Sequence, residues 1–225
     1  MSSHARRARI LTAAGVALLL AGAIAILVGV RAQRSAPQPP AAAASPVSVV
    51  PTASPPAPTD RDAATRGPVL ARSLPVRLDI PAIDVHSDVQ QLGLNADGSV
   101  QVPPLGRDSH AGWYKYSPTP GELGPSVILG HIDSAAYGPG VFFNLGKLRQ
   151  RDAVSITLAD HTVAVFEIEK VVEYQKAQFP TLAVYGNTDH AALRLITCGG
   201  AFDPAKHSYE SNIVAYAALV SSHPA

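Results

Sequence analysis

The chain contains one cysteine, Cys198, which ends the apolar run 193–198 and directly precedes Gly199 and Gly200. A single thiol cannot form an intramolecular disulfide, and most free cysteines are small buried hydrophobes. Cys198 differs because it ends a predicted strand, which favours partial exposure. The glycines after it let another backbone approach. This position suits a nucleophile, because the thiolate is the attacking species in cysteine catalysis.

His131 is the candidate partner of Cys198. It follows the short apolar run 126–130 and begins a polar cluster that includes Asp133. A histidine close to a thiol lowers its pKa or accepts its proton, and the two residues need only be neighbours in space. A histidine at a strand end is also often an ordinary surface residue. Asp133 could orient His131 or cap a turn.

The region 73–225 is predicted to fold as one mainly β domain. Alternation at 76–80 and 154–158 has the period of half-buried strands, and the runs 162–172, 193–198 and 212–219 are also strand-like. The sequence Asn-Ala-Asp-Gly at 95–98 is typical of a hairpin turn. Short strands separated by Gly and Pro indicate a closed or nearly closed β-barrel. Residues 141–148 form the best candidate for a short helix.

The N-terminal 72 residues are expected to place this domain outside the cytoplasm. Residues 1–9 form a basic tail, and residues 10–30 contain no charge and are long enough to cross a membrane as a helix. Three Arg before this stretch and two after it favour a cytoplasmic N-terminus. A cleaved signal peptide is the alternative. Residues 31–72 are rich in Pro and Ala and are predicted to form a disordered linker.

The charge is divided between these two regions. Before residue 73 there are eight Arg and two acidic residues, a balance of +6, and the remainder has ten basic and fifteen acidic residues, a balance of −5. The predicted folded domain therefore has no basic stripe, which argues against a nucleic-acid partner. Its six histidines other than His131 lack metal-ligand spacing; they are His86, His110, His161, His190, His207 and His223.

Several motifs, in order from about residue 74 to 219, resemble those of the sortase family. The opening strand 78–83, the Gly130-His131 segment and the Leu-Ile-Thr-Cys sequence at 195–198 each resemble a family motif. Other stretches resemble the actinobacterial class often called F, or class E/F; they lie at 94–98, 112–114, 141–143 and 198–203. One such motif is a weak signal, but the ordered set behind a predicted anchor is specific.

The resemblance implies a membrane-anchored cysteine transpeptidase with a sortase β-barrel and a hydrophobic groove. Cys198 would attack the Thr–Gly carbonyl of a Leu-Pro-x-Thr-Gly-like sorting signal on a secreted protein, and His131 would act as acid and base. An amine of a peptidoglycan precursor or a pilin would then resolve the thioacyl-enzyme. This chemistry requires no metal or organic cofactor. The implied location is the cell membrane, single-pass, with the catalytic domain facing the cell wall.

One expected group is missing. Sortases generally use an arginine on the strand after the cysteine loop to stabilise the oxyanion, but no Arg follows Cys198, and Glu210 stands near that place. Arg194 is the first substitute, because residues four apart on a strand share a face, although their Cα atoms are about 13 Å apart. Lys206 is the second, without the planar fork of Arg.

Two alternatives from other classes stay open at this stage. The first is a thiol hydrolase or peptidase that lets water resolve the same acyl-enzyme. The second is a non-catalytic binding module, which the missing downstream Arg would favour and the retention of Cys198 and His131 would disfavour.

Overall fold

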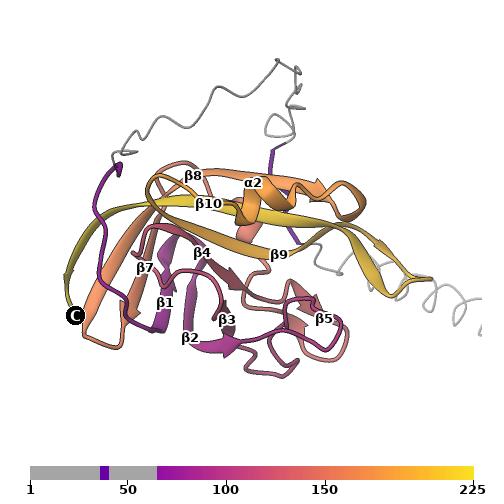
Figure 1. Cartoon of the computed structure of the whole chain (residues 1–225). Coiled ribbons are helices and arrows are strands. Elements are labelled where there is room, and N and C mark those ends of the chain that lie inside the picture. Colours follow the sequence, from indigo (N-terminus) through magenta and orange to yellow (C-terminus); the bar gives the residue numbers. More distant parts are fainter. Residues whose placement is uncertain (1–35, 41–64) are drawn as a thin grey trace, which may run out of the picture. The chain divides into compact units, whose positions relative to one another are not determined.

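The computed structural model describes residues 36–40 and 65–225, and the latter form a closed barrel of eight strands (Figure 1). The prediction of a mainly β barrel is therefore confirmed. Around the barrel the strands follow the order β1, β2, β3, β4, β9, β10, β8, β7. Their bounds are β1 Pro75–Ile80, β2 Val85–Leu92, β3 Ala111–Tyr114, β4 Gly124–Leu129, β7 Ala153–Leu158, β8 Thr162–Gln175, β9 Ala191–Asp203 and β10 Ser208–Pro224.

Two of the neighbouring strand pairs are parallel, namely β2 with β3 and β4 with β9; the other six are antiparallel. The parallel β4–β9 pair matters most for function, because β4 ends at Leu129 beside Ile196, two residues before Cys198. The β9 strand continues to Asp203, so the prediction that Cys198 ends its strand is wrong. A small separate sheet pairs β5 (Asp133–Ser134) with β6 (Gly138–Pro139) directly after β4.

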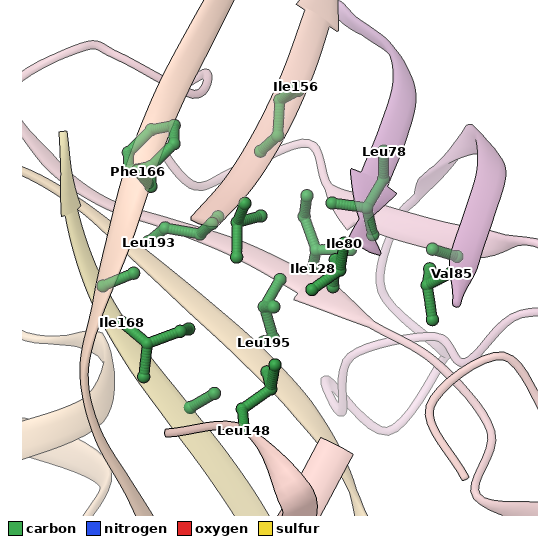
Figure 2. Packing of buried hydrophobic residues seen from close by; sticks show 14 of the residues in the cluster. Leu78, Ile80, Val85, Ile128, Leu148, Ile156, Phe166, Ile168, Leu193 and Leu195 are labelled. Atoms are coloured by element: carbon green, nitrogen blue, oxygen red, sulfur yellow. The ribbon is translucent and has the colours of Figure 1, made fainter. Parts of the chain in front are cut away.

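The main hydrophobic core contains side chains from strands all around the barrel (Figure 2). Alternation along each strand sends every second residue into it, as the period of two requires. On β9, for example, Leu193 and Leu195 are fully buried in this core, beside Ile128 of β4. Trp113 is also fully buried in it.

A second apolar cluster lies on the opposite face of β4, β9 and β10. It is formed by the residues that alternate along these strands with those of the main core. Its buried members are Val127, Val172, Val184, Ile196, Val214 and Tyr216. Val184 belongs to the α-helix α2 (Thr181–Tyr185) and is fully buried. These strands are thus buried on both faces, which explains their nearly continuous apolar sequences.

The predicted helical segment 141–148 contains only the 3₁₀ turn η3 (Leu145–Lys147). Glycine at position 146 and Asn144 just before the turn explain why no longer α-helix forms there. The five-residue helix α2 was not predicted, because it is too short to show helical periodicity. The turn predicted at 95–98 is present, with the Asn95 carbonyl accepting a hydrogen bond from the Gly98 N–H at 3.0 Å.

Contacts with the barrel begin before the predicted domain boundary at residue 73. The Arg66 N–H donates to the Asp189 carbonyl at 2.7 Å, and the Leu70 N–H donates to the Gly121 carbonyl at 2.8 Å. The predicted basic tail and membrane anchor, residues 1–30, lie outside the described residues, as do 31–35 and 41–64. Within residues 36–40 and 65–225, none of the helices has the length and apolar character to cross a bilayer.

Candidate active site

The register of the parallel β4–β9 pair brings the predicted nucleophile and its partner together. Leu129 lies beside Ile196, and the Gly130 N–H donates to the Ile196 carbonyl at 3.1 Å. His131 lies two residues beyond Leu129, just past the end of β4, and Cys198 lies two residues beyond Ile196, within β9. Because neighbouring strands are about 4.8 Å apart, this register brings the two residues to the same part of the sheet. Both residues are partly exposed.

His131 is oriented by contacts on two sides. Its Nε2 lies 2.6 Å from the Pro103 carbonyl oxygen, to which it donates a proton, because a carbonyl oxygen only accepts. In the neutral imidazole this leaves Nδ1 as the basic nitrogen available to a thiol. The His131 carbonyl in turn accepts from the Phe142 N–H at 3.0 Å. A side chain at Gly140 would overlap that carbonyl, so glycine is needed there.

Asp133 bonds to a residue from β10 that the sequence did not single out. The Tyr209 hydroxyl donates to Asp133 Oδ2 at 2.5 Å, which joins β10 to the segment after His131. Burial, followed by the hydrogen bond to Asp133, raises the pKa of Tyr209 well above its ordinary value. The hydroxyl therefore stays protonated as a donor.

The part of β9 that follows Cys198 is irregular. Cys198 pairs with Asn212 and Gly199 with Ser211, but the register between β9 and β10 shifts between Ser211 and Tyr209. Gly200 falls in this bulge with a positive φ of 74°, a conformation that favours glycine. Its N–H is released from the ladder and instead donates to the Gln38 side chain at 3.0 Å. A backbone donor thus faces the N-terminal segment beside the thiol.

Arg194, the first predicted oxyanion cation, shares the second apolar face with Ile196 and hence with Cys198. Its guanidinium carbon lies 4.5 Å from the ring centroid of Tyr216, its partner on β10, and Nη1 donates to the Leu193 carbonyl at 3.0 Å. The residue is only 5% exposed, and this burial lowers the pKa of its guanidinium. Its buried Nε has no acceptor among the described residues.

Lys206, the second predicted candidate for this role, and Glu210, near the expected arginine position, lie in or near the β9–β10 hairpin. Lys206 is exposed in its turn and forms an ion pair with Asp203 at 2.9 Å. Glu210, near the place expected for an arginine, is exposed in the bulge between Tyr209 and Ser211.

Sequence reasoning also missed Arg107. This residue lines a small cavity of about 40 Å³ together with His131 and Asp133. No sequence motif signals this position, because Arg107 precedes His131 by 24 residues and lies in a loop. A second arginine thus lines a cavity with His131. It precedes both catalytic candidates in the sequence, whereas the expected arginine would follow Cys198.

The rest of the described chain adds no metal centre. Within residues 36–40 and 65–225, no three His, Cys, Asp or Glu side chains are placed to hold a metal ion. His86 instead lies against Asp79 at 2.6 Å, and His190 lies against Asp189 at 2.8 Å. The groups around Cys198 that could act on a peptide are thus its thiol, the His131 imidazole and nearby hydrogen-bond donors.

Comparison with known proteins adds three findings. The family model described as the sortase domain matches residues 78–220. No curated protein sequence matches the chain. Several solved structures share the fold, and three of them are 17–18% identical in sequence. Streptococcus pneumoniae sortase C matches with a TM-score of 0.50 over 66% of this chain and 68% of its own. Listeria monocytogenes sortase A matches with a TM-score of 0.50 over 68% of this chain and 91% of its own, and Actinomyces oris SrtA sortase with a TM-score of 0.51 over 74% and 91%.

Proposed function

The chain belongs to the sortase family, and from this premise we propose that it is a membrane-anchored transpeptidase of the actinobacterial class E/F type. The family and fold imply a cysteine transpeptidase that acts on proteins with sorting signals. The observation that best supports activity in this chain is the β4–β9 register, which pairs Leu129 with Ile196, two residues before His131 and Cys198 respectively. The class assignment rests on the motifs at 94–98, 112–114, 141–143 and 198–203.

In the proposed reaction Cys198 Sγ, as thiolate, attacks the carbonyl carbon of the Thr–Gly bond in a Leu-Pro-x-Thr-Gly-like signal. A carbon–sulfur bond forms, the carbon–nitrogen bond breaks, and protonated His131 gives its proton to the departing amine. The resulting thioacyl-enzyme is attacked by an amine from a peptidoglycan precursor or a pilin. Neutral His131 takes a proton from this amine, and Sγ leaves as the thiolate.

Arg194 is the proposed oxyanion cation. It alternates with the core residues of β9 as Cys198 does, so both share one face of the strand. Its buried Nε has no acceptor among the described residues. Arg107 is the second candidate, supported by the cavity that it lines with His131. A guanidinium aimed at the oxyanion stabilises charge that develops only in the transition state.

The test is an assay of the full chain with a sorting-signal peptide and an excess of an amine, followed by mass spectrometry. We expect a ligated product and a thioacyl-enzyme adduct, which must lie on Cys198 because the chain has one cysteine. Cys198→Ala should abolish both, and full activity in this variant would refute the mechanism. Hydrolysis without ligation would support the hydrolase alternative, and binding without either product would support a non-catalytic module.

The proposed location has its own support and test. Residues 10–30 contain no charge and are bounded by arginines, as in a single-pass anchor with its catalytic domain outside the cytoplasm. Fractionation of cells that express the full chain should recover it in the membrane fraction. Protease added to cells stripped of their wall should then digest the barrel. Recovery in the soluble cytoplasmic fraction would refute the anchor.

A further inference from the structure

A small hairpin, residues 93–101, directly follows β2 and is closed by Gln101. The Gln101 N–H donates to the Gly93 carbonyl at 3.0 Å, and Gln101 Oε1 accepts from the Gly93 N–H at 2.8 Å. Further along the hairpin, Leu94 and Val100 pair as an antiparallel bridge. Because its first residue continues from the end of β2, the hairpin is attached to the barrel wall.

The carbonyl group that holds the His131 ring comes two residues after Gln101. Pro103 is buried, and its carbonyl oxygen accepts from His131 Nε2 at 2.6 Å. Pro103 and Pro104 have a nearly fixed φ and no N–H, so this stretch cannot donate to the barrel and depends on its neighbours for its position. On the far side, the Ser109 hydroxyl donates to the Pro104 carbonyl at 3.0 Å. Gln101 is the anchor on the near side.

The side-chain amide of Gln101 is fully engaged although the residue is exposed. Besides the bond that Oε1 accepts, Nε2 donates to the Leu94 carbonyl at 3.3 Å. A Cβ built on Gly93 would lie only 3.2 Å from Oε1, so glycine at this position leaves the space that the amide oxygen occupies. Both polar atoms of the side chain thus bond to the backbone of the hairpin that they close.

We propose that Gln101 is a positioning residue for the proposed transpeptidation, because it fixes the Pro103 carbonyl that holds His131 with its proton on Nε2. This inference rests on the proposed function for the reaction that the imidazole serves. With Nε2 bonded to Pro103, Nδ1 is the nitrogen left to exchange a proton with the thiol or the amine. Without a fixed carbonyl, the ring loses its orientation and populates both tautomers.

Three variants of the full chain separate the hydrogen bond from the bulk of the side chain. Gln101→Leu keeps a side chain of similar volume and removes the acceptor of the Gly93 N–H. Gln101→Glu keeps an oxygen where that acceptor stands, so it is the conservative variant that should retain the unmodified behaviour. Gln91→Ala, at an exposed position on β2, is the matched control. Thermal melting verifies that each variant is folded.

The direct readout is the ¹⁵N NMR spectrum of the histidine side chains at about pH 8.5, where an ordinary histidine is neutral. A spectrum of His131→Ala identifies the His131 signals. In the unmodified chain these signals should show one tautomer, with the proton on Nε2. Gln101→Leu should give a mixture of both tautomers, while Gln101→Glu and Gln91→Ala should keep the single form. A single tautomer in folded Gln101→Leu would overturn the proposal.

Ligation kinetics test the consequence for catalysis. Gln101→Leu should lower kcat by about fivefold, the effect of losing one ordinary hydrogen bond. The KM should stay within about twofold of the original, because a group that acts through His131 makes no uniform contribution to substrate binding. Gln101→Glu should restore most of the lost kcat. An equal loss in Gln101→Leu and Gln101→Glu would contradict the role of the hydrogen bond.

The NMR measurement needs no turnover, so the two proposals fail separately. A tautomer mixture in Gln101→Leu, without a ligated product from the unmodified chain, would support the role of Gln101 toward His131 and refute transpeptidation. Ligation with an unchanged kcat and a single tautomer in Gln101→Leu would refute the positioning role and leave the transpeptidase standing.

Discussion

Among single residues, the candidate site depends on pairs of groups that come from distant parts of the chain. His131 follows β4 and is held by the Pro103 carbonyl, while Asp133 is bonded to Tyr209 from the start of β10. None of these pairings is local in sequence. The chemistry of each residue could be assessed from its type, but its partner could not.

The first prediction for a single residue concerns the oxyanion cation. Arg194→Ala should lower kcat in the ligation assay by about 100-fold, the usual effect of removing one oxyanion donor. Arg149→Ala, at an exposed position before β7, is the control and should retain normal turnover. If Arg194→Ala is folded and fully active while Arg107→Ala is impaired, the role belongs to Arg107.

The second prediction for a single residue concerns Tyr209. Tyr209→Phe removes the hydrogen bond to Asp133 and should lower the free energy of unfolding by about 1–2 kcal/mol, as for a bond to a charged group near the surface. Urea denaturation at neutral pH measures this loss. A double-mutant cycle with Asp133→Ala should show that the two effects are not additive. Additive effects would mean that the hydroxyl and the carboxylate do not interact.

Tyr209 also gives a pH dependence. Burial and the bond to Asp133 raise its folded pKa above the ordinary value of 10.0, so the folded state holds this proton more tightly than the unfolded state. The stabilisation is complete below pH 10 and is lost as the pH rises toward the folded pKa. Unfolding curves should therefore show decreasing stability above this ordinary value, with a smaller decrease in Tyr209→Phe. An equal decrease of stability with pH in the two proteins would show that Tyr209 is not the group responsible.

At the scale of elements, the parallel β4–β9 pair sets the position of both reactive groups. The strand ends are connected to the segment 138–142, where the Gly140 N–H donates to the Ile132 carbonyl at 2.8 Å. These hydrogen bonds hold the backbone that follows β4, beyond Leu129, in a fixed conformation. They keep the backbone of His131 in place although His131 itself lies outside the strand.

Gly140→Ala tests this connection. The added methyl group would overlap the His131 carbonyl, so the histidine backbone must shift, and a displacement of about 1 Å in a catalytic group can lower activity about 100-fold. The barrel core does not include this position, so the circular dichroism spectrum should stay unchanged. Normal ligation kinetics in the variant would show that the His131 backbone tolerates the shift.

At the scale of the whole molecule, the barrel supplies the rigidity on which the site depends. Its core is continuous from β1 to β10, with strands β4, β9 and β10 buried on both faces. The β9 strand is central to this arrangement, since Leu195 packs in the main core and Ile196 packs in the second cluster. Stability and site geometry therefore share the same strand.

Leu195→Ala should consequently lower the free energy of unfolding by about 2–5 kcal/mol, the range for a large aliphatic side chain removed from a core. Leu182→Ala is the matched control, because Leu182 of α2 is 85% exposed, and it should change stability by less than about 0.5 kcal/mol. Denaturant titration of both variants measures the difference. Similar losses in the two would contradict the assignment of the core.

Much of the barrel was predictable because six of its strands show alternation or compact apolar runs: β1, β4, β7, β8, β9 and β10. The length of β9 and β10 was underestimated, since their ends pass through Gly200, Tyr209 and neighbouring residues that lack a strand pattern. The β8 strand was likewise predicted only to residue 172. Strand β3 is only four residues long, too short for a clear period, and depends on its neighbours for pairing.

Residue types and strand period are local properties, so they were enough to indicate the family, the mainly β class and the two residues best suited to the chemistry. The pairing of β4 with β9, with Leu129 beside Ile196, could be seen only in the folded barrel. The tertiary structure also placed Arg107 in the same small cavity as His131, and the segment 36–40 beside Gly200. These neighbours are far apart in the chain, and such long-range contacts depend on how the whole barrel closes.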